Sequence, residues 1–225
     1  HRRAMSQTET LMARDGHEFH AYIARPAGRA RGAIVVLQEI FGVNHHIRAV
    51  ADRFADAGWL AIAPALFDRV ARGVELGYTA ADLPAARGTM MQVDTAKALL
   101  DIAAATAVVR HAGKVAAVGF CWGGRLAWLA GCEQPVSAAA AYYGTRIGQH
   151  LPQAPRCPIL LHFGERDEHI PPAEIAQIRA ACPAAEVHLY PAGHGFACDE
   201  RAGFDAASAA LAWQRTQEFL GKHLG

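Results

Sequence analysis

Two patterns of apolar and polar positions follow one another repeatedly along this chain. Residues 17–26 alternate polar and apolar side chains, which predicts a strand with one face in solvent. Residues 32–38 and 59–64 are continuous apolar runs, which are typical of strands covered on both faces. Another strand is predicted at 114–120, and a strand followed by a loop is predicted within each of the ranges 136–144, 157–168 and 185–195.

Helical spacing separates these strands. Residues 44–58 carry apolar side chains at helical intervals, with Asn44 as a candidate N-cap and Gly58 as the stop. Residues 65–92 mix glycine, proline and charge, and we expect a long excursion there with a short helix near 80–91. The remaining helices are predicted at 93–113, 124–132, 171–181 and 203–222.

Strands that alternate with helices predict an α/β fold in which helices cover both faces of a mostly parallel central sheet. The 225 residues fit one domain of this class, and we expect it to span residues 5–225. Residues 1–4 read as an artificial extension ahead of Met5.

The composition of the chain limits the classes of partner that we expect. A formal net charge of +1 gives no reason to expect nucleic acid or an acidic membrane surface. No apolar run reaches the roughly 20 residues that span a bilayer, and the first ten residues lack a signal-peptide core. The five cysteines are irregularly spaced without a C-x-x-C pair, so we expect reduced thiols in a cytoplasmic protein and no zinc site.

Chemically capable side chains follow several of the predicted strands, where the functional groups of parallel sheets collect. Glu39 follows the strand at 32–38. The later strands are followed in turn by Cys121, by the acids Glu165, Asp167 and Glu168, and by His194. A nucleophile, then an acid, then a histidine is the chain order of α/β-hydrolases.

Cys121 stands at the centre of a G-x-C-x-G pattern between Gly119 and Gly123, where a nucleophile elbow usually carries serine. A thiol needs a nearby base or charge to raise its thiolate fraction, and an imidazole can supply both. In such a site the oxyanion is held by backbone N–H groups. The position after the nucleophile is Trp122, and the most suitable residue of the early loop 38–42 is Ile40.

At this point the chain resembles the dienelactone hydrolases, also called carboxymethylenebutenolidases. The matching stretches are QEIFGVN (38–44), GFCWGG (119–124), YYG (142–144), RDEHIP (166–171) and AGHGFA (192–197). The resemblance implies an α/β-hydrolase fold with Cys121 as nucleophile, Asp167 as acid and His194 as base. It also implies that Glu39 is the second carboxylate that holds the resting thiol.

The resemblance also bears on the substrate. Well-known members carry an arginine four residues after the catalytic histidine, and this chain has Cys198 there. The family's other substrate-binding arginine falls in the loose segment, where Arg69, Arg72 and Arg87 are candidates. The further candidate substrate contacts are Phe41, Tyr78 and Tyr143.

We therefore expect an enzyme that cleaves small esters or lactones through a thioester, using a Cys-His-Asp triad and neither metal nor organic cofactor. We expect it to be a monomer or a weak homodimer. Two alternatives stay open: a catalytically silent binding or regulatory protein of the same fold, and a thiol redox sensor based on Cys121.

Overall fold

The computed structural model describes residues 5–225, and the extension expected at residues 1–4 lies outside this range. The chain divides into two compact units, one ending at Val115 and the other running from Ala116 to Gly225. The expectation of a single domain stays a prediction. No helix in the part of the chain that the structure describes is long and apolar enough to cross a membrane.

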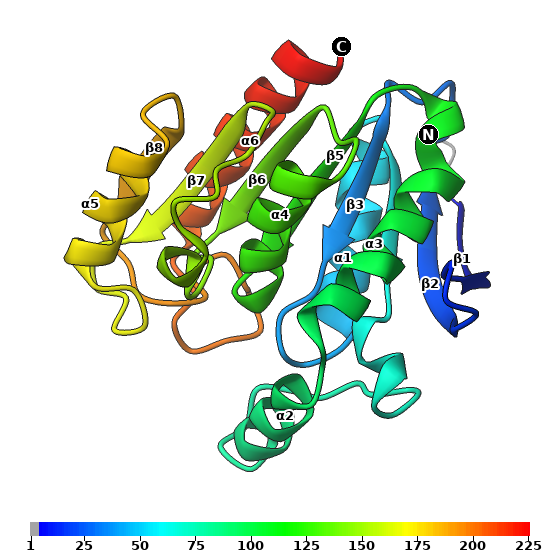
Figure 1. The fold of residues 1–225 in the computed structure, drawn as a ribbon, viewed down its shortest axis with the longest axis horizontal. Helices are drawn as coiled ribbons and strands as arrows, with labels where there is room; N and C mark the ends of the chain where they lie inside the picture. The colour runs from blue at the N-terminus through cyan, green and yellow to red at the C-terminus, as the bar shows by residue number, and fades with distance from the viewer. Residues whose placement is uncertain (1–4) are drawn as a thin grey trace. The chain divides into compact units, whose positions relative to one another are not determined.

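The first unit contains four strands in the order β1-β2-β4-β3 (Figure 1). Both β1·β2 and β2·β4 are antiparallel pairs, while β3 and β4 are parallel. Strands β3 and β4 are buried along their whole length, as their continuous apolar runs predict. The bounds are β1 (Met5–Met12), β2 (Glu18–Arg25), β3 (Ala33–Leu37) and β4 (Leu60–Pro64).

Strand β1 was not predicted. Its burial pattern explains this, because Leu11 is the one buried residue among eight and the rest of the strand gives no apolar alternation. Backbone pairing with β2, from Met5 opposite Arg25 to Met12 opposite Glu18, defines the strand instead.

The helices of the first unit are α1 (His45–Asp56), α2 (Asp82–Met91) and α3 (Thr95–Val109), with the short 3₁₀ helices η1 (Leu66–Arg69) and η2 (Arg110–Ala112). Asn44 caps α1 as predicted, since its side chain accepts a hydrogen bond from the backbone N–H of Ile47. Helices α1 and α3 pack on opposite faces of the strands, whereas α2 stands apart from them and buries only Ala86 (Figure 1).

The second unit holds four parallel strands in the order β5-β6-β7-β8. They are β5 (Val115–Phe120), β6 (Ala138–Tyr142), β7 (Ile159–Gly164) and β8 (Glu186–Tyr190). Helices α4 (Trp122–Glu133) and α6 (Ala206–Leu224) cover the strands, while α5 (Pro172–Ala181) packs on the 3₁₀ helix η3 (Ile147–His150). Mostly parallel strands covered by helices confirm the predicted α/β class.

The register of the second unit brings the carboxyl ends of its strands to one edge, with β7 and β8 reaching two residues beyond β5 and β6. Phe120 pairs with Tyr142, Tyr142 with His162, and Gly164 with Tyr190. Each strand therefore delivers the residues that follow it to the same edge, which is where parallel sheets carry their functional groups.

Candidate functional site

Cys121 occupies the sharp turn between β5 and α4. Its backbone has φ 58° and ψ −119°, a conformation that residues with a Cβ rarely adopt. Such strain persists only where the surroundings over-determine it, and it is the signature of a nucleophile elbow. The turn places the Cys121 thiol 3.0 Å from Nε2 of His194.

Glycines make this turn possible. A Cβ atom on Gly119 would lie 1.8 Å from the carbonyl oxygen of Gly123, and one on Gly124 would lie 2.8 Å from Cα of Gly144. Both contacts are with backbone, which cannot move aside as a flexible side chain does. Glycine is thus required at positions 119 and 124 because strand, turn and helix cross so closely there.

Gly119→Ala is expected to lower the free energy of unfolding by at least about 2 kcal/mol, because the added methyl overpacks a rigid crossing. Urea unfolding measures the change. Gly88→Ala is the matched control, since Gly88 lies in α2 with nothing within 4 Å of the added Cβ. A helix gains up to about 1 kcal/mol from this replacement. Equal free energies of unfolding for Gly119→Ala and wild type would contradict the close contact between Gly119 and the backbone of Gly123.

The structure selects one acid from the three that follow β7. Oδ2 of Asp167 lies 2.7 Å from Nδ1 of His194, and its Oδ1 accepts the backbone N–H of His169 at 2.8 Å. Asp167 is buried, whereas Glu165 and Glu168 are exposed. The carboxylate accepts the Nδ1 proton of His194, so Nε2 of the same ring faces the thiol.

Backbone hydrogen bonds join the loop that carries Asp167 to the loop that carries His194. The N–H of Glu165 donates to the carbonyl of Tyr190 at 2.8 Å, and that of Arg166 donates to the carbonyl of Ala192 at 3.0 Å. A Cβ on Gly164 would lie 2.4 Å from the Ala192 oxygen, so the two loops touch closely there. These paired loops hold acid and base at a fixed separation.

The charge state of His194 follows from its two partners. Burial acts to lower the pKa of this imidazole, but the negative charge on Cys121 and the hydrogen bonds with Asp167 and Cys121 outweigh burial and raise it to about 10. The raised pKa favours a protonated imidazole at neutral pH, with its Nε2 beside the sulfur of Cys121.

Alkaline pH is expected to remove the contribution of His194 to stability. A histidine whose pKa rises from 6.5 to about 10 on folding stabilises the native state fully below about pH 6.5, and this contribution is lost as pH rises through about 10. The unfolding free energies of wild type and His194→Gln should converge between about pH 7 and about pH 10 in urea titrations. A difference that stays constant over this range would contradict the raised pKa.

Tyr143, a predicted substrate contact, packs against the imidazole. Its ring meets the ring of His194 edge-on with centroids 5.1 Å apart, and it also meets Phe196 at 5.2 Å. The backbone of Tyr143 has φ 39°, and its N–H donates to the carbonyl of His162 at 2.7 Å. Its position shows that it shapes the surroundings of His194, while contact with a substrate stays a prediction.

A buried hydrogen-bond network joins β6, β7 and β8 to α6, and the sequence did not predict it. Thr216 on α6 donates its hydroxyl proton to the carbonyl of Ala212 at 2.8 Å. Its oxygen therefore accepts from Tyr142 (2.7 Å) and from Nε2–H of His162 (2.9 Å), which leaves Nδ1 of His162 to accept from the Tyr190 hydroxyl at 2.7 Å.

Each hydrogen bond in this network then has one donor and one acceptor, so the network fixes the tautomer of His162. Burial, followed by the positive charges of His188 and Arg215, holds the pKa of His162 well below its usual value. The neutral ring thus ties the ends of β6, β7 and β8 to α6. In the sequence, the only signal was a polar residue inside an apolar strand.

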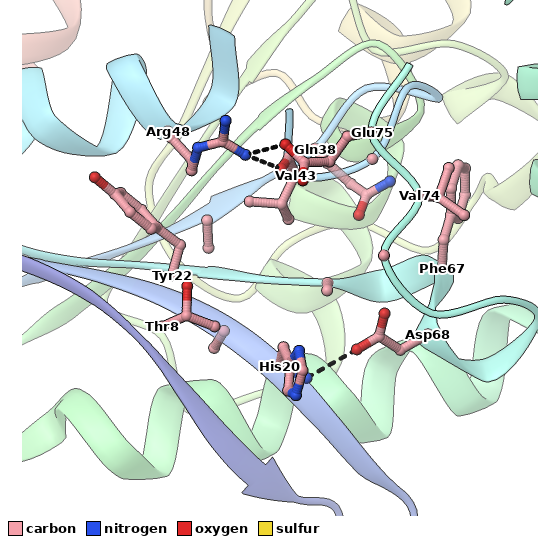
Figure 2. A pocket seen from close by; sticks show the side chains of 15 residues that line it. Thr8, His20, Tyr22, Gln38, Val43, Arg48, Phe67, Asp68, Val74 and Glu75 are labelled. Atoms are coloured by element: carbon pink, nitrogen blue, oxygen red, sulfur yellow. Dashed lines mark hydrogen bonds and ion pairs between the residues drawn. The ribbon is translucent and has the colours of Figure 1, made fainter. Parts of the chain in front are cut away.

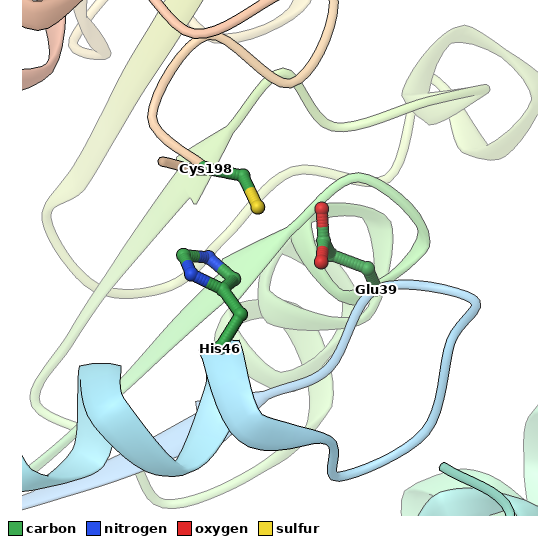
Figure 3. Close-up of side chains that lie close together, drawn as sticks. All are labelled: Glu39, His46 and Cys198. Carbon is green, nitrogen blue, oxygen red and sulfur yellow. The ribbon is translucent and has the colours of Figure 1, made fainter. Parts of the chain in front are cut away.

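In the first unit, Glu39 follows β3 and is fully buried. The hydroxyl of Tyr78 donates to Oε1 of Glu39 at 2.6 Å, and the Asn44 amide donates to the same hydroxyl at 3.1 Å. A carboxylate oxygen of Glu39 also lies within 4.8 Å of a ring nitrogen of His46, which is on the first turn of α1 (Figure 3). Tyr78, predicted as a substrate contact, thus positions Glu39.

Arg69 is not available to bind a substrate as predicted. Its guanidinium donates to both carboxylate oxygens of Asp101, at 2.8 and 3.0 Å, and to both of Asp15, also at 2.8 and 3.0 Å. These two acids satisfy its charge, and the buried Asp101 anchors it to α3. Arg87 lies exposed on α2, and its predicted role is not tested by its position.

The remaining predicted residues are buried. Phe41 packs edge-on against Tyr78 with ring centroids 4.6 Å apart. Cys198 is fully buried in the loop after β8 (Figure 3). Ile40 belongs to the first unit and Trp122 opens α4 in the second, and their shared role as oxyanion donors stays a prediction, as does the action of Glu39 on the thiol.

Comparison with known proteins agrees with this architecture. The sequence model of the dienelactone hydrolase family matches residues 19–224. The carboxymethylenebutenolidase of Pseudomonas putida is 35% identical over 222 residues, which cover 94% of each chain.

Solved structures extend the likeness to three dimensions. One from Klebsiella pneumoniae, assigned as a dienelactone hydrolase, superposes with a TM-score of 0.85 at 30% identity, covering 97% of this chain and 98% of its own. An esterase of Pyrococcus furiosus has the same fold at 14% identity, with a TM-score of 0.71 and coverage of 99% and 94%.

Proposed function

This chain belongs to the dienelactone hydrolase family, and on that premise we propose that it hydrolyses small carboxylic esters or lactones with Cys121 as the nucleophile. The observation that carries the proposal is the continuous relay from the Cys121 thiol through His194 to Asp167, at 3.0 and 2.7 Å. The family supplies the class of hydrolase, and the relay supplies a chemical route.

In the acylation step, the Cys121 thiolate attacks the carbonyl carbon and the carbonyl oxygen takes up the negative charge. Backbone N–H groups at Trp122 and Ile40 would receive this oxyanion. When the tetrahedral intermediate collapses, the C–O bond to the leaving group breaks. The His194 imidazolium gives its Nε2 proton to the departing alkoxide, and a thioester on Cys121 remains.

Deacylation uses the same groups in the reverse sense. The now neutral His194 removes a proton from water, and the resulting hydroxide attacks the thioester carbonyl. Collapse of the second tetrahedral intermediate releases the carboxylic acid and regenerates the thiolate beside the imidazolium. Asp167 stabilises the charged ring in both steps and keeps Nε2 directed at the sulfur.

The substrate class follows from the charges available. The resemblance places an arginine four residues after the base, and Cys198 there offers no charge for a substrate carboxylate. Of the three arginines considered in the loose segment, Arg69 is neutralised by Asp15 and Asp101, and Arg72 donates to the backbone carbonyl of Glu18. Because bidentate guanidinium pairs supply both affinity and orientation, we infer that uncharged esters or lactones are preferred over carboxylate-bearing ones.

A paired substrate panel tests this function. Aryl esters and five-membered lactones, each with and without a carboxylate, are compared by kcat/KM, and brief exposure to p-nitrophenyl acetate is followed by mass spectrometry of the intact chain and its peptides. The expected result is faster turnover of the uncharged member of each pair and an acetyl group on Cys121. Acetylation of another residue instead would refute Cys121 as the nucleophile. Faster turnover of the carboxylate-bearing substrates would refute the preference for uncharged ones.

A further inference from the structure

The first unit contains a cavity of about 190 Å³ that the proposed hydrolysis does not use (Figure 2). Its lining comes from β1, β2, the ends of β3 and β4, α1, η1 and the loop at 73–75. This volume holds more than isolated waters, but it is smaller than the roughly 300–1,000 Å³ of sites for drug-sized ligands. The cavity therefore suits a small organic molecule.

Asp68 gives this cavity a charged wall. The residue is 8% exposed and lies on η1. Its Oδ2 accepts the backbone N–H of His20 at 2.8 Å, while its Oδ1 has no hydrogen-bond partner among residues 5–225. Figure 2 shows this second oxygen turned away from His20. This largely buried residue thus keeps one carboxylate oxygen without a protein donor, and a ligand donor at this position would satisfy it.

The cationic group of the lining is already neutralised. Arg48 on α1 forms an ion pair with Glu75 and also donates to the carbonyl of Val43 at 2.8 Å. With that pair closed, Asp68 is the carboxylate of the lining that has no Lys or Arg partner among residues 5–225. The cavity therefore favours a cation and disfavours an anion.

The rest of the lining combines apolar side chains with the polar Thr8, Tyr22 and Gln38. Phe67, which is 2% exposed, lines the cavity from η1. Val43 lines it from the loop between β3 and α1, and Val74 from the loop at 73–75. Ala63 and Ala65 add small apolar surface at the end of β4. A ligand with a short alkyl body and one charged head could place its head at Asp68 and its body against these apolar side chains.

We propose that this cavity binds a small organic cation, whose ammonium group donates to Oδ1 of Asp68 while its alkyl part packs against Phe67, Val43 and Val74. The proposal stands apart from the hydrolase function. It requires neither Cys121 nor His194, so its failure would leave the proposed reaction untouched.

Calorimetric titration of the full chain with n-butylamine tests the site, with 1-butanol and butanoate as the matched neutral and anionic probes. The amine is expected to bind saturably, and the alcohol and the anion at least about tenfold more weakly, since a charged hydrogen bond to a partly buried carboxylate accounts for about that factor. Binding of 1-butanol as tight as that of the amine, or no saturation by the amine at millimolar concentration, would overturn the proposal.

Asp68→Asn keeps the shape of the side chain and removes its charge, so amine affinity should fall at least about tenfold. Asp94→Asn is the matched control, because Asp94 caps α3 outside the lining and asparagine caps a helix equally well. Ala65→Leu, which adds volume at the lining without changing charge, gives a second test if Asp68→Asn does not fold. Unchanged amine affinity in either lining variant, once folding is verified by thermal melting, would refute the site.

Discussion

Cys121→Ser is expected to lower kcat for p-nitrophenyl acetate by at least about a thousandfold. A serine hydroxyl gives up its proton to a base far less readily than a thiol does, so the proposed nucleophile becomes much less reactive although the side chain keeps its shape. Steady-state kinetics with the purified chain measures the effect. The acetylated intermediate should disappear from the mass spectrum at the same time.

Cys132→Ala is the control for this experiment. Cys132 is also a buried free thiol on α4, and burial, followed by the nearby charge of Glu133, raises its pKa to about 12. It is therefore neutral at working pH, and its loss should leave kcat within about twofold of wild type. Full activity of Cys121→Ser, or a comparable loss in Cys132→Ala, would remove Cys121 from the role of nucleophile.

Asp167→Asn is expected to lower kcat by up to about ten-thousandfold, which is the loss that the same substitution causes in a serine-protease triad. Asparagine cannot stabilise the imidazolium, and its amide can favour the wrong tautomer of His194. The pKa of His194, which the Asp167 hydrogen bond helps to raise, should move down in this variant. The pH dependence of kcat/KM and the NMR titration of the ring measure the two effects separately.

Glu165→Gln and Glu168→Gln are the natural controls, because the same change in charge is made one or two residues from Asp167. Both side chains are exposed, and activity should change by less than about threefold. If Glu168→Gln inactivated the enzyme while Asp167→Asn did not, the acid would be assigned to the wrong residue. An unaltered titration of His194 in Asp167→Asn would likewise contradict the hydrogen bond as a cause of its raised pKa.

Local patterns predicted most of the fold because its buried strands are apolar throughout and its helices have recognisable ends. Asn44 predicted the start of α1, and proline ended β4. Strand β1 escaped because an exposed edge strand buries too little to show an apolar period. Its place is decided by hydrogen bonds to β2, which the residue types of one strand do not encode.

The sequence predicted which strand ends carry the candidate site residues. It did not predict which side chains form hydrogen bonds with one another there. Cys121 and His194 each stood alone after a strand, whereas three acids followed β7 and only their burial separates Asp167 from Glu165 and Glu168. Arg69 was misjudged because one of its partners, Asp15, lies 54 residues away in the sequence. Pairing over such distances depends on the folded chain.

The paired loops after β7 and β8 have a consequence for engineering. Because their backbones are bonded to each other next to Asp167 and His194, a change in the length of either segment would shift carboxylate and imidazole relative to the sulfur. Loop grafts from other hydrolases should therefore exchange residues 164–170 and 190–195 together. Residues outside these two segments can be changed more freely when the substrate specificity of the enzyme is redesigned.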